Sequence, residues 1–111
     1  MVKSKKIHVV SEYYPRPKWR YEREGDGSGE VFRRDVLAPA LRNNAKVEVD
    51  LNGYNRYGPS FISEAFGGLV RDESFTLDDL KQKLVITHDV LQSIVDFCWI
   101  EIEKASKEIE K

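Results

Sequence analysis

The sequence predicts an α/β protein, with a mixed sheet of about four strands, helices packed on it and a long C-terminal helix. The main observation is a strand–loop–helix unit between Lys46 and Val70. Apolar and acidic residues alternate over Val47–Leu51, which is the period of a strand. Over 61–70, apolar residues recur every three or four positions, which is the period of a helix. A second helical pattern covers residues 89–110.

The composition indicates one ordinary globular domain, residues 1–111. Apolar residues make up 41% and charged residues 33%, and the net charge of −1 gives no general attraction to nucleic acid or acidic membranes. No apolar run approaches the roughly 20 residues that span a bilayer, and the N-terminus does not resemble a signal peptide. Cys98 is the only cysteine. We therefore expect a cytoplasmic protein without an internal disulfide and without a membrane partner.

The first third of the chain predicts two strands. Ile7 to Val10 forms the first and ends before two prolines, and Trp19–Arg23, where aromatic and basic residues alternate, forms a short second strand. The glycine-rich turn 25–29 resembles a phosphate loop, but no lysine–serine or lysine–threonine pair follows it. The simpler interpretation is that Ser28 caps the next helix.

Three further helices and one strand follow from spacing and capping residues. The first helix runs from about residue 30 to 43, and Pro39 should kink or divide it. Thr76 is a good N-cap for a short helix over 77–82, and the β-branched residues 84–86 predict the last strand. The final helix, 89–110, has a buried stripe of apolar residues, which comprises Leu91, Ile94 or Val95, Cys98, Ile102, Ala105 and Ile109.

Several segments, in this order and spacing, resemble a small bacterial and archaeal STAS-like family of unknown function. This family is distantly similar to the STAS domains of sulfate transporters and anti-sigma-factor antagonists. The segments together cover roughly residues 5–100 and comprise Trp19–Tyr21, Gly27–Arg33, Leu37–Leu41, Val49–Gly53, Ser60–Phe61 and Glu64–Leu69. The resemblance implies a single STAS-like domain.

The resemblance does not carry over the regulatory phosphorylation of the antagonists. Their loop before the corresponding helix has an aspartate, a phosphorylated serine, a second hydroxyl residue and a glycine. In this chain those positions are Gly58, Pro59, Ser60 and Phe61, so the phosphoacceptor is missing. The resemblance still implies that this helix edge docks a partner protein, and the antagonists suggest an ATPase of the histidine-kinase type.

The loop before the helix supplies the candidate binding residues, which are Tyr54, Asn55, Arg56, Tyr57, Gly58 and Ser60. Helix N-termini attract anions, so Ser60 could lie at an anion site or accept a phosphate, or be an ordinary first-turn serine. Tyr54 and Tyr57 beside Arg56 suit a protein interface, although either tyrosine could pack beneath the loop. Gly67 and Gly68 are interpreted as packing residues that allow another element, such as the N-terminal strand or the final helix, to approach.

We therefore predict a non-enzymatic regulatory or adaptor domain that binds a protein partner through Tyr54–Phe66. His8, His88 and Cys98 form no recognisable zinc or nucleophile pattern, and we expect no cofactor. One alternative is a small anion or nucleotide binder at the same helix N-terminus. Another is nucleic-acid binding by the basic N-terminal third, although the pI of 6.1 is far below that of a typical nucleic-acid-binding domain. The cations concerned are Lys3, Lys5, Lys6, Arg16, Lys18, Arg20, Arg23, Arg33 and Arg34.

Overall fold

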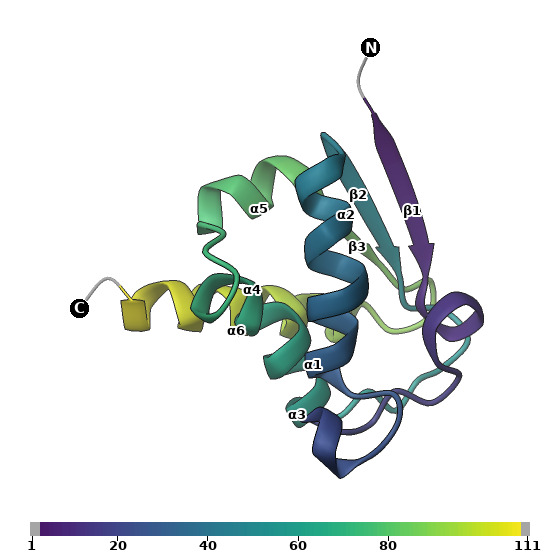
Figure 1. Cartoon of the computed structure of the whole chain (residues 1–111). Helices are drawn as coiled ribbons and strands as arrows, with labels where there is room; N and C mark the ends of the chain where they lie inside the picture. The colour runs from purple at the N-terminus through teal and green to yellow at the C-terminus, as the bar shows by residue number, and fades with distance from the viewer. Residues whose placement is uncertain (1–2, 110–111) are drawn as a thin grey trace.

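A computed structural model describes residues 3–109 and confirms the α/β class (Figure 1). These residues form three strands, β1 (Ser4–His8), β2 (Lys46–Asp50) and β3 (Leu84–Thr87), in the order β1-β2-β3. Both pairs are parallel, with Ile7 opposite Val49 and Val49 opposite Ile86. The predicted mixed sheet of about four strands is therefore corrected to a parallel sheet of three.

The predicted strand Trp19–Arg23 is wrong. This segment is a loop that leads into a 3₁₀ turn, Glu22–Glu24. The carbonyls of Trp19 and Arg20 accept hydrogen bonds from Gly29 N and Glu30 N, at 2.8 and 3.0 Å, so they bind the start of a helix rather than a neighbouring strand. Alternation of aromatic and basic residues here reflects a folded loop, in which the Trp19 ring lies against Gly25.

Two long helical runs connect the strands, and each contains a π-helical middle. The first comprises α1 (Gly29–Val31), a π segment (Phe32–Leu37) and α2 (Ala38–Asn43). It changes from π to α geometry next to Pro39, where a division or kink was expected. The second comprises α3 (Pro59–Ile62), a π segment (Ser63–Gly67) and α4 (Gly68–Arg71). The chain continues through α5 (Leu77–Lys83), and a π-helical turn, Val9–Tyr13, follows β1.

Both predicted N-caps are confirmed. Ser28 Oγ accepts a hydrogen bond from Val31 N at 3.2 Å, which satisfies one of the free amides at the start of α1. Thr76 Oγ1 accepts from Asp79 N at 3.0 Å, and Asp79 Oδ2 accepts from Thr76 N at 3.1 Å, which is a capping box.

The sheet has one buried and one open face. Figure 1 shows the helices gathered on one side of the strands. The strand side chains on that side are buried, and they are Ile7, Val47, Val49, Leu84 and Ile86. The other face carries ion pairs from Lys6 Nζ to Glu48 Oε2 at 3.6 Å and to Asp50 Oδ2 at 3.8 Å. Parallel sheets are usually covered on both faces, and here charged side chains allow one face to meet water.

The last helix, α6 (Gln92–Ile109), begins three residues later than predicted. Its buried stripe includes Val95, Cys98, Ile102 and Ala105, whereas Ile109 is 55% exposed, contrary to expectation. The predicted end at Glu110 lies outside the described residues. Burial raises the pKa of the Cys98 thiol, which keeps it protonated and unreactive. None of the helices over residues 3–109 is both long and apolar enough to cross a membrane.

The two helical runs pack against each other through Gly29. A Cβ atom at this position would lie 2.7 Å from the carbonyl oxygen of Phe61 and 3.0 Å from Ala65 N, both backbone atoms. A Cβ on Gly68 would meet Arg33 Nη1 at 2.5 Å, and one on Gly67 would meet Arg71 Nη1 at 2.8 Å. The close neighbours of Gly67 and Gly68 are therefore arginine side chains rather than the N-terminal strand or the final helix.

We predict that Gly29→Ala lowers the free energy of unfolding by about 1–3 kcal/mol, because the new methyl group overpacks a backbone contact that cannot rotate away. The matched control is Gly58→Ala, where an added Cβ has no neighbour within 4 Å. This variant should stay within about 1 kcal/mol of the wild type. Urea unfolding of both variants measures the difference, and equal midpoints would contradict the packing argument.

Candidate functional site

The loop between β2 and α3, residues 51–58, is held at its base by Asp50 and Asn52. Asp50 Oδ1 accepts hydrogen bonds from Asn52 N at 2.9 Å and from Asn52 Nδ2 at 2.8 Å. Asn52 Oδ1 in turn accepts from Asp89 N at 2.8 Å, in the segment that follows β3. Because β2 and β3 are parallel, the segments that follow them start at the same end of the sheet. The hydrogen bond from Asp89 N to Asn52 Oδ1 joins the two segments there.

His88 makes a second connection between these segments. Its Nδ1 accepts hydrogen bonds from Val90 N at 3.2 Å and from Leu91 N at 3.1 Å, so Nδ1 carries no proton. Its Nε2–H then donates to the carbonyl of Tyr54, with 3.0 Å between the two heavy atoms. The buried imidazole is therefore a neutral bridge between the candidate loop and the start of α6.

The two tyrosines of the loop play different parts. Tyr57 is buried, and its hydroxyl donates to the carbonyl of Leu51 at 3.1 Å. Burial raises the pKa of Tyr57, so this hydroxyl remains a donor. The ring of Tyr54 packs edge-on against Tyr57, with 5.1 Å between centroids, and stays half-buried. Tyr57 thus packs beneath the loop, one of the two interpretations open from sequence, and Tyr54 remains accessible.

The other candidate residues lie at the surface in varying degree. Asn55 and Arg56 are exposed, and Gly58 and Ser60 are half-buried. Gly58 is the N-cap residue of α3 and offers no side chain to the free amides of its first turn. Beyond this turn the predicted surface ends, because Phe61, Ile62, Ala65 and Phe66 are buried in the core. The accessible part of Tyr54–Phe66 is therefore mainly the loop and the start of α3.

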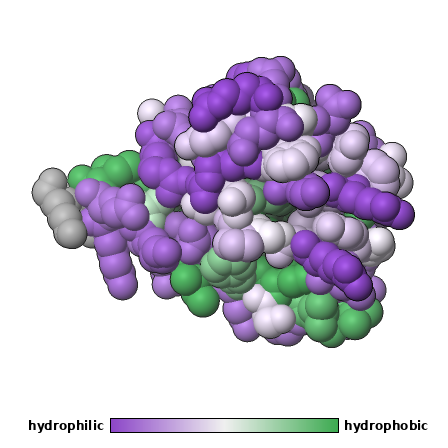
Figure 2. All heavy atoms as spheres, turned by 90° about the horizontal axis from the view of Figure 1, so that it is seen from below, coloured by the Kyte–Doolittle hydropathy of each residue, from purple (hydrophilic) through white to green (hydrophobic). Residues whose placement is uncertain are grey.

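The structure adds Val90 to the candidate residues. A shallow hollow of about 430 Å³ is lined by Gly53, Tyr54, Asn55, Arg56 and Val90. Val90 is 71% exposed, the largest value among the exposed large hydrophobic residues of the described chain. When the molecule is viewed from below, hydrophobic side chains gather mainly along its lower right border, and a smaller group lies at the left (Figure 2). The site is therefore a hollow whose exposed apolar residue is Val90 and whose lining includes Tyr54 and Arg56, and we call its five lining residues the loop hollow.

A larger, polar cavity lies between the two helical runs and the end of α6. It measures about 680 Å³, and its lining comprises Arg20, Tyr21, Glu30, Arg33, Ser63, Glu64, Arg71, Asp72 and Glu108. Its lining includes the buried ion pair between Arg33 Nη1 and Glu64 Oε2, at 2.5 Å. Arg33 Nε also donates to Glu73 Oε2 at 3.1 Å. Because the buried charges are paired within the protein, we interpret them as fixing the alignment of the two helical runs rather than as a binding site.

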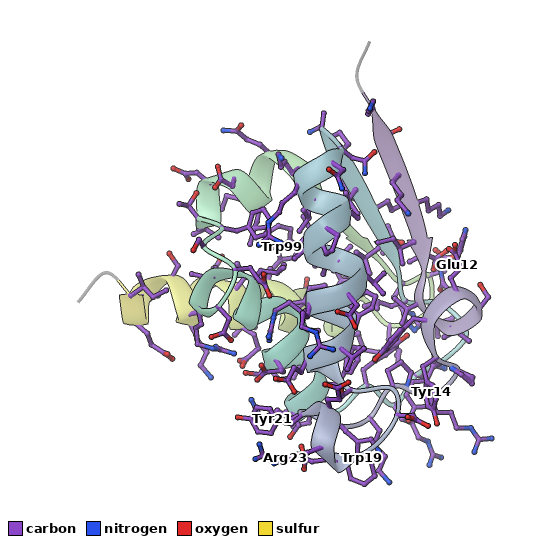
Figure 3. All side chains as sticks on the ribbon, viewed as in Figure 1. Glu12, Tyr14, Trp19, Tyr21, Arg23 and Trp99 are labelled. Carbon is purple, nitrogen blue, oxygen red and sulfur yellow. The ribbon has the colours of Figure 1, made fainter. Side chains whose placement is uncertain are left out.

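The basic residues of the N-terminal third do not form one surface. Arg33 is buried, and Arg34 pairs with Asp35 Oδ1 at 2.8 Å. Figure 3 shows Trp19, Tyr21 and Arg23 at the opposite end of the molecule from the start of β1, where Lys3, Lys5 and Lys6 lie. Arg23 lies over the Tyr21 ring, 4.5 Å from its centroid. This distribution does not provide the continuous basic face that phosphate backbones require.

Within residues 3–109, no group of three or more histidine, cysteine, aspartate or glutamate side chains could hold a metal ion.

The fold and the loop hollow define a class, a parallel α/β domain with a hollow in the segments that follow its second and third strands. The model of one family, "STAS-like domain of unknown function (DUF4325)", matches residues 28–92, more than half of the chain. The chain therefore belongs to this family, as the resemblance indicated. Searches of curated proteins and of solved structures found no significant match.

We predict that His88→Ala lowers the free energy of unfolding by about 1–3 kcal/mol, because Val90 N, Leu91 N and the Tyr54 carbonyl lose their partner. His88→Asn should recover part of the loss, since its Oδ1 can replace Nδ1 as acceptor. Urea unfolding measures stability, and amide exchange of Val90 and Leu91 reports the local effect. Unchanged exchange in His88→Ala would show that the histidine does not hold this segment.

Asp50 should contribute to stability only while it is ionised. Burial acts to raise the pKa of Asp50, but hydrogen bonds from Asn52 and the charges of His8 and Lys6 outweigh it, so the net pKa is lowered. This stabilisation is complete above the ordinary value of 3.8 and is lost as the pH falls through the folded-state pKa. The melting temperature of Asp50→Asn should therefore fall less than that of the wild type when the pH is lowered from about 7 to about 2. A variant profile parallel to that of the wild type would disprove this role.

Proposed function

We propose that this protein is a non-enzymatic regulatory or adaptor domain that binds a protein partner through the loop hollow and the adjacent start of α3. The observation that carries the proposal is the exposed Val90 beside Tyr54 and Arg56. Tyrosine and arginine around an apolar centre are the residues that dominate the binding energy of protein interfaces. By analogy with the anti-sigma-factor antagonists, an ATPase of the histidine-kinase type is a suitable partner.

The rigidity of the loop supports this proposal. The bond from Tyr57 to the Leu51 carbonyl closes the loop on itself, and the bonds between Tyr54 and His88 and between Asn52 and Asp89 tie it to the segment after β3. A loop ordered before binding loses less conformational entropy on association, so more of the contact energy appears as affinity. These bonds leave the accessible part of the Tyr54 ring and the exposed Arg56 side chain available to a partner.

A second candidate is a small anion or nucleotide bound at the start of α3. The specific observation in its favour is that Gly58 provides no side-chain cap, so the first amides of this helix have no side-chain acceptor. Arg56 is the nearest cation in sequence. Stabilisation by a nucleotide without any protein, measured as a rise in melting temperature, would favour this candidate.

The test uses tagged protein in a pull-down from the native cell, followed by binding measurements with the purified partner. We expect Val90→Asp and Arg56→Glu each to weaken binding by about 2 kcal/mol or more, roughly 30-fold, because both alter the centre of the contact. Their melting temperatures should stay close to that of the wild type, since both side chains are exposed.

Val85→Asp is the matched control, because Val85 is 48% exposed but lies on the open face of the sheet. Arg16→Glu controls for the change of charge at another exposed arginine. The proposal fails if Val90→Asp and Val85→Asp bind the purified partner equally well.

A further inference from the structure

His88 holds two lining residues of the loop hollow in place through a single ring. Its Nδ1 accepts hydrogen bonds from Val90 N at 3.2 Å and from Leu91 N at 3.1 Å, and its Nε2 lies 3.0 Å from the Tyr54 carbonyl oxygen. Val90 and Tyr54 both line the loop hollow. The imidazole itself is only 6% exposed. The Val90 side and the Tyr54 side of the hollow are therefore joined through one titratable group.

This arrangement requires a neutral ring with its lone pair on Nδ1. A proton on Nδ1 removes that lone pair and directs an N–H toward the two backbone N–H groups, and donors cannot bond to each other. The amides of Val90 and Leu91 would then have to find another acceptor or stay unpaired at a cost in free energy. Nε2 is a donor in both states of the ring, so the bond to Tyr54 survives. Protonation therefore loosens the Val90 side of the hollow and leaves the Tyr54 side attached.

The segment that would move contains no regular structure. Residues 88–91 lie between the end of β3 and the start of α6. Asp89 N is held separately, by Asn52 Oδ1 at 2.8 Å, and this bond does not involve the imidazole. Val90 is 71% exposed, so its side chain makes few contacts that oppose a shift. A change of position at Val90 can thus occur while β3 and α6 stay intact.

Other titratable or charged groups belong to the elements around His88. They are Tyr54, Arg56 and Tyr57 on the loop, Asp50 at the end of β2, Asp89 beside the histidine, Cys98 on α6 and His8 at the end of β1. Burial raises the pKa of both Tyr57 and Cys98, so these groups keep their protons. Hydrogen bonds from Asn52 and nearby cations outweigh burial and lower the pKa of Asp50, which keeps its carboxylate ionised above the ordinary value of 3.8.

The two histidines are the side chains of a type that ordinarily gains a proton between about pH 8 and pH 5. They differ in what a proton does to their contacts. His8 Nδ1 lies 3.1 Å from Asp50 Oδ2, and a charged imidazole strengthens this contact. His88 instead loses the lone pair on which its two backbone bonds depend. A variant at each position therefore separates the two effects.

We propose that His88 is a pH-sensitive switch of the loop hollow: the neutral ring holds Val90 beside Tyr54, and protonation at Nδ1 releases Val90. The inference rests on the proposed function, because it makes the binding of a protein partner through the loop hollow depend on pH. The partner binds while His88 is neutral. Its affinity falls as the pH is lowered through the range in which His88 gains a proton.

The first experiment uses the full chain alone. NMR measures the amide-exchange protection factors and follows the His88 side-chain nitrogens at about pH 7.5 and about pH 5. We expect the protection of Val90 and Leu91 to fall at least about tenfold at the lower pH, because their acceptor is lost. Protection of Ile102, in the interior of α6, should change little.

Two variants serve as controls for this measurement. His88→Asn should show no such fall, since its Oδ1 can accept from the same amides and gains no proton in this range. His8→Gln should keep the fall seen in the wild type. If His88→Asn does not fold, the wild type alone provides the test, and the His88 nitrogen signals and the protection of Val90 must then change with one common midpoint.

The second experiment measures the affinity of the partner purified by the pull-down at the same two pH values. The wild type should lose at least about tenfold more affinity than His88→Asn between them, and this comparison removes any titration of the partner itself. The switch is overturned if the protection of Val90 and Leu91 does not fall, if His88→Asn shows the same fall, or if both chains lose affinity equally. Failure of the proposed function is a different result, because Val90→Asp and Val85→Asp test it at pH 7.5 alone.

Discussion

The packing of the first helical run, residues 29–43, against the second, residues 59–71, determines where the candidate site lies. Gly29 allows the backbones to meet at Phe61 and Ala65, so α3 begins in a fixed place relative to β2. The loop that joins β2 to α3 must then span a set distance between two rigid elements. Its shape follows from this constraint together with the bonds made by Asn52 and His88.

The buried ion pair of Arg33 and Glu64 also joins the two helical runs, because Arg33 belongs to the first run and Glu64 to the second. Desolvation lowers the pKa of the Arg33 guanidinium, but its bonds to Glu64 and Glu73 outweigh this effect, and the net pKa is raised. A buried ion pair contributes little net stability relative to apolar residues of the same volume, yet loss of one partner leaves an uncompensated charge. We therefore regard this pair as a device that specifies how the two helical runs align. Gly68 provides the space for the Arg33 side chain.

The local features of the fold could be predicted from sequence, whereas the features that depend on distant contacts could not. The alternation at Val47–Leu51, the proline at the start of α3 and the caps Ser28 and Thr76 are local signals, and the structure confirms each. The segment Trp19–Arg23 alternates like a strand, but its carbonyls bond to the start of a helix that the pattern does not reveal. The roles of His88 and Val90 depend on the meeting of two loops that are far apart in sequence. A polar residue directly after the last strand was the only available signal for His88.

The enclosed position of Cys98 has a practical consequence for experiments in solution. It is the only cysteine of the chain, and its thiol lies in the core, away from reagents. A cysteine introduced at Asn55, an exposed loop position, would therefore be the single thiol that a maleimide dye can reach in the folded protein. The native chain thus allows a fluorophore to be attached at one chosen point without prior removal of its own sulfur.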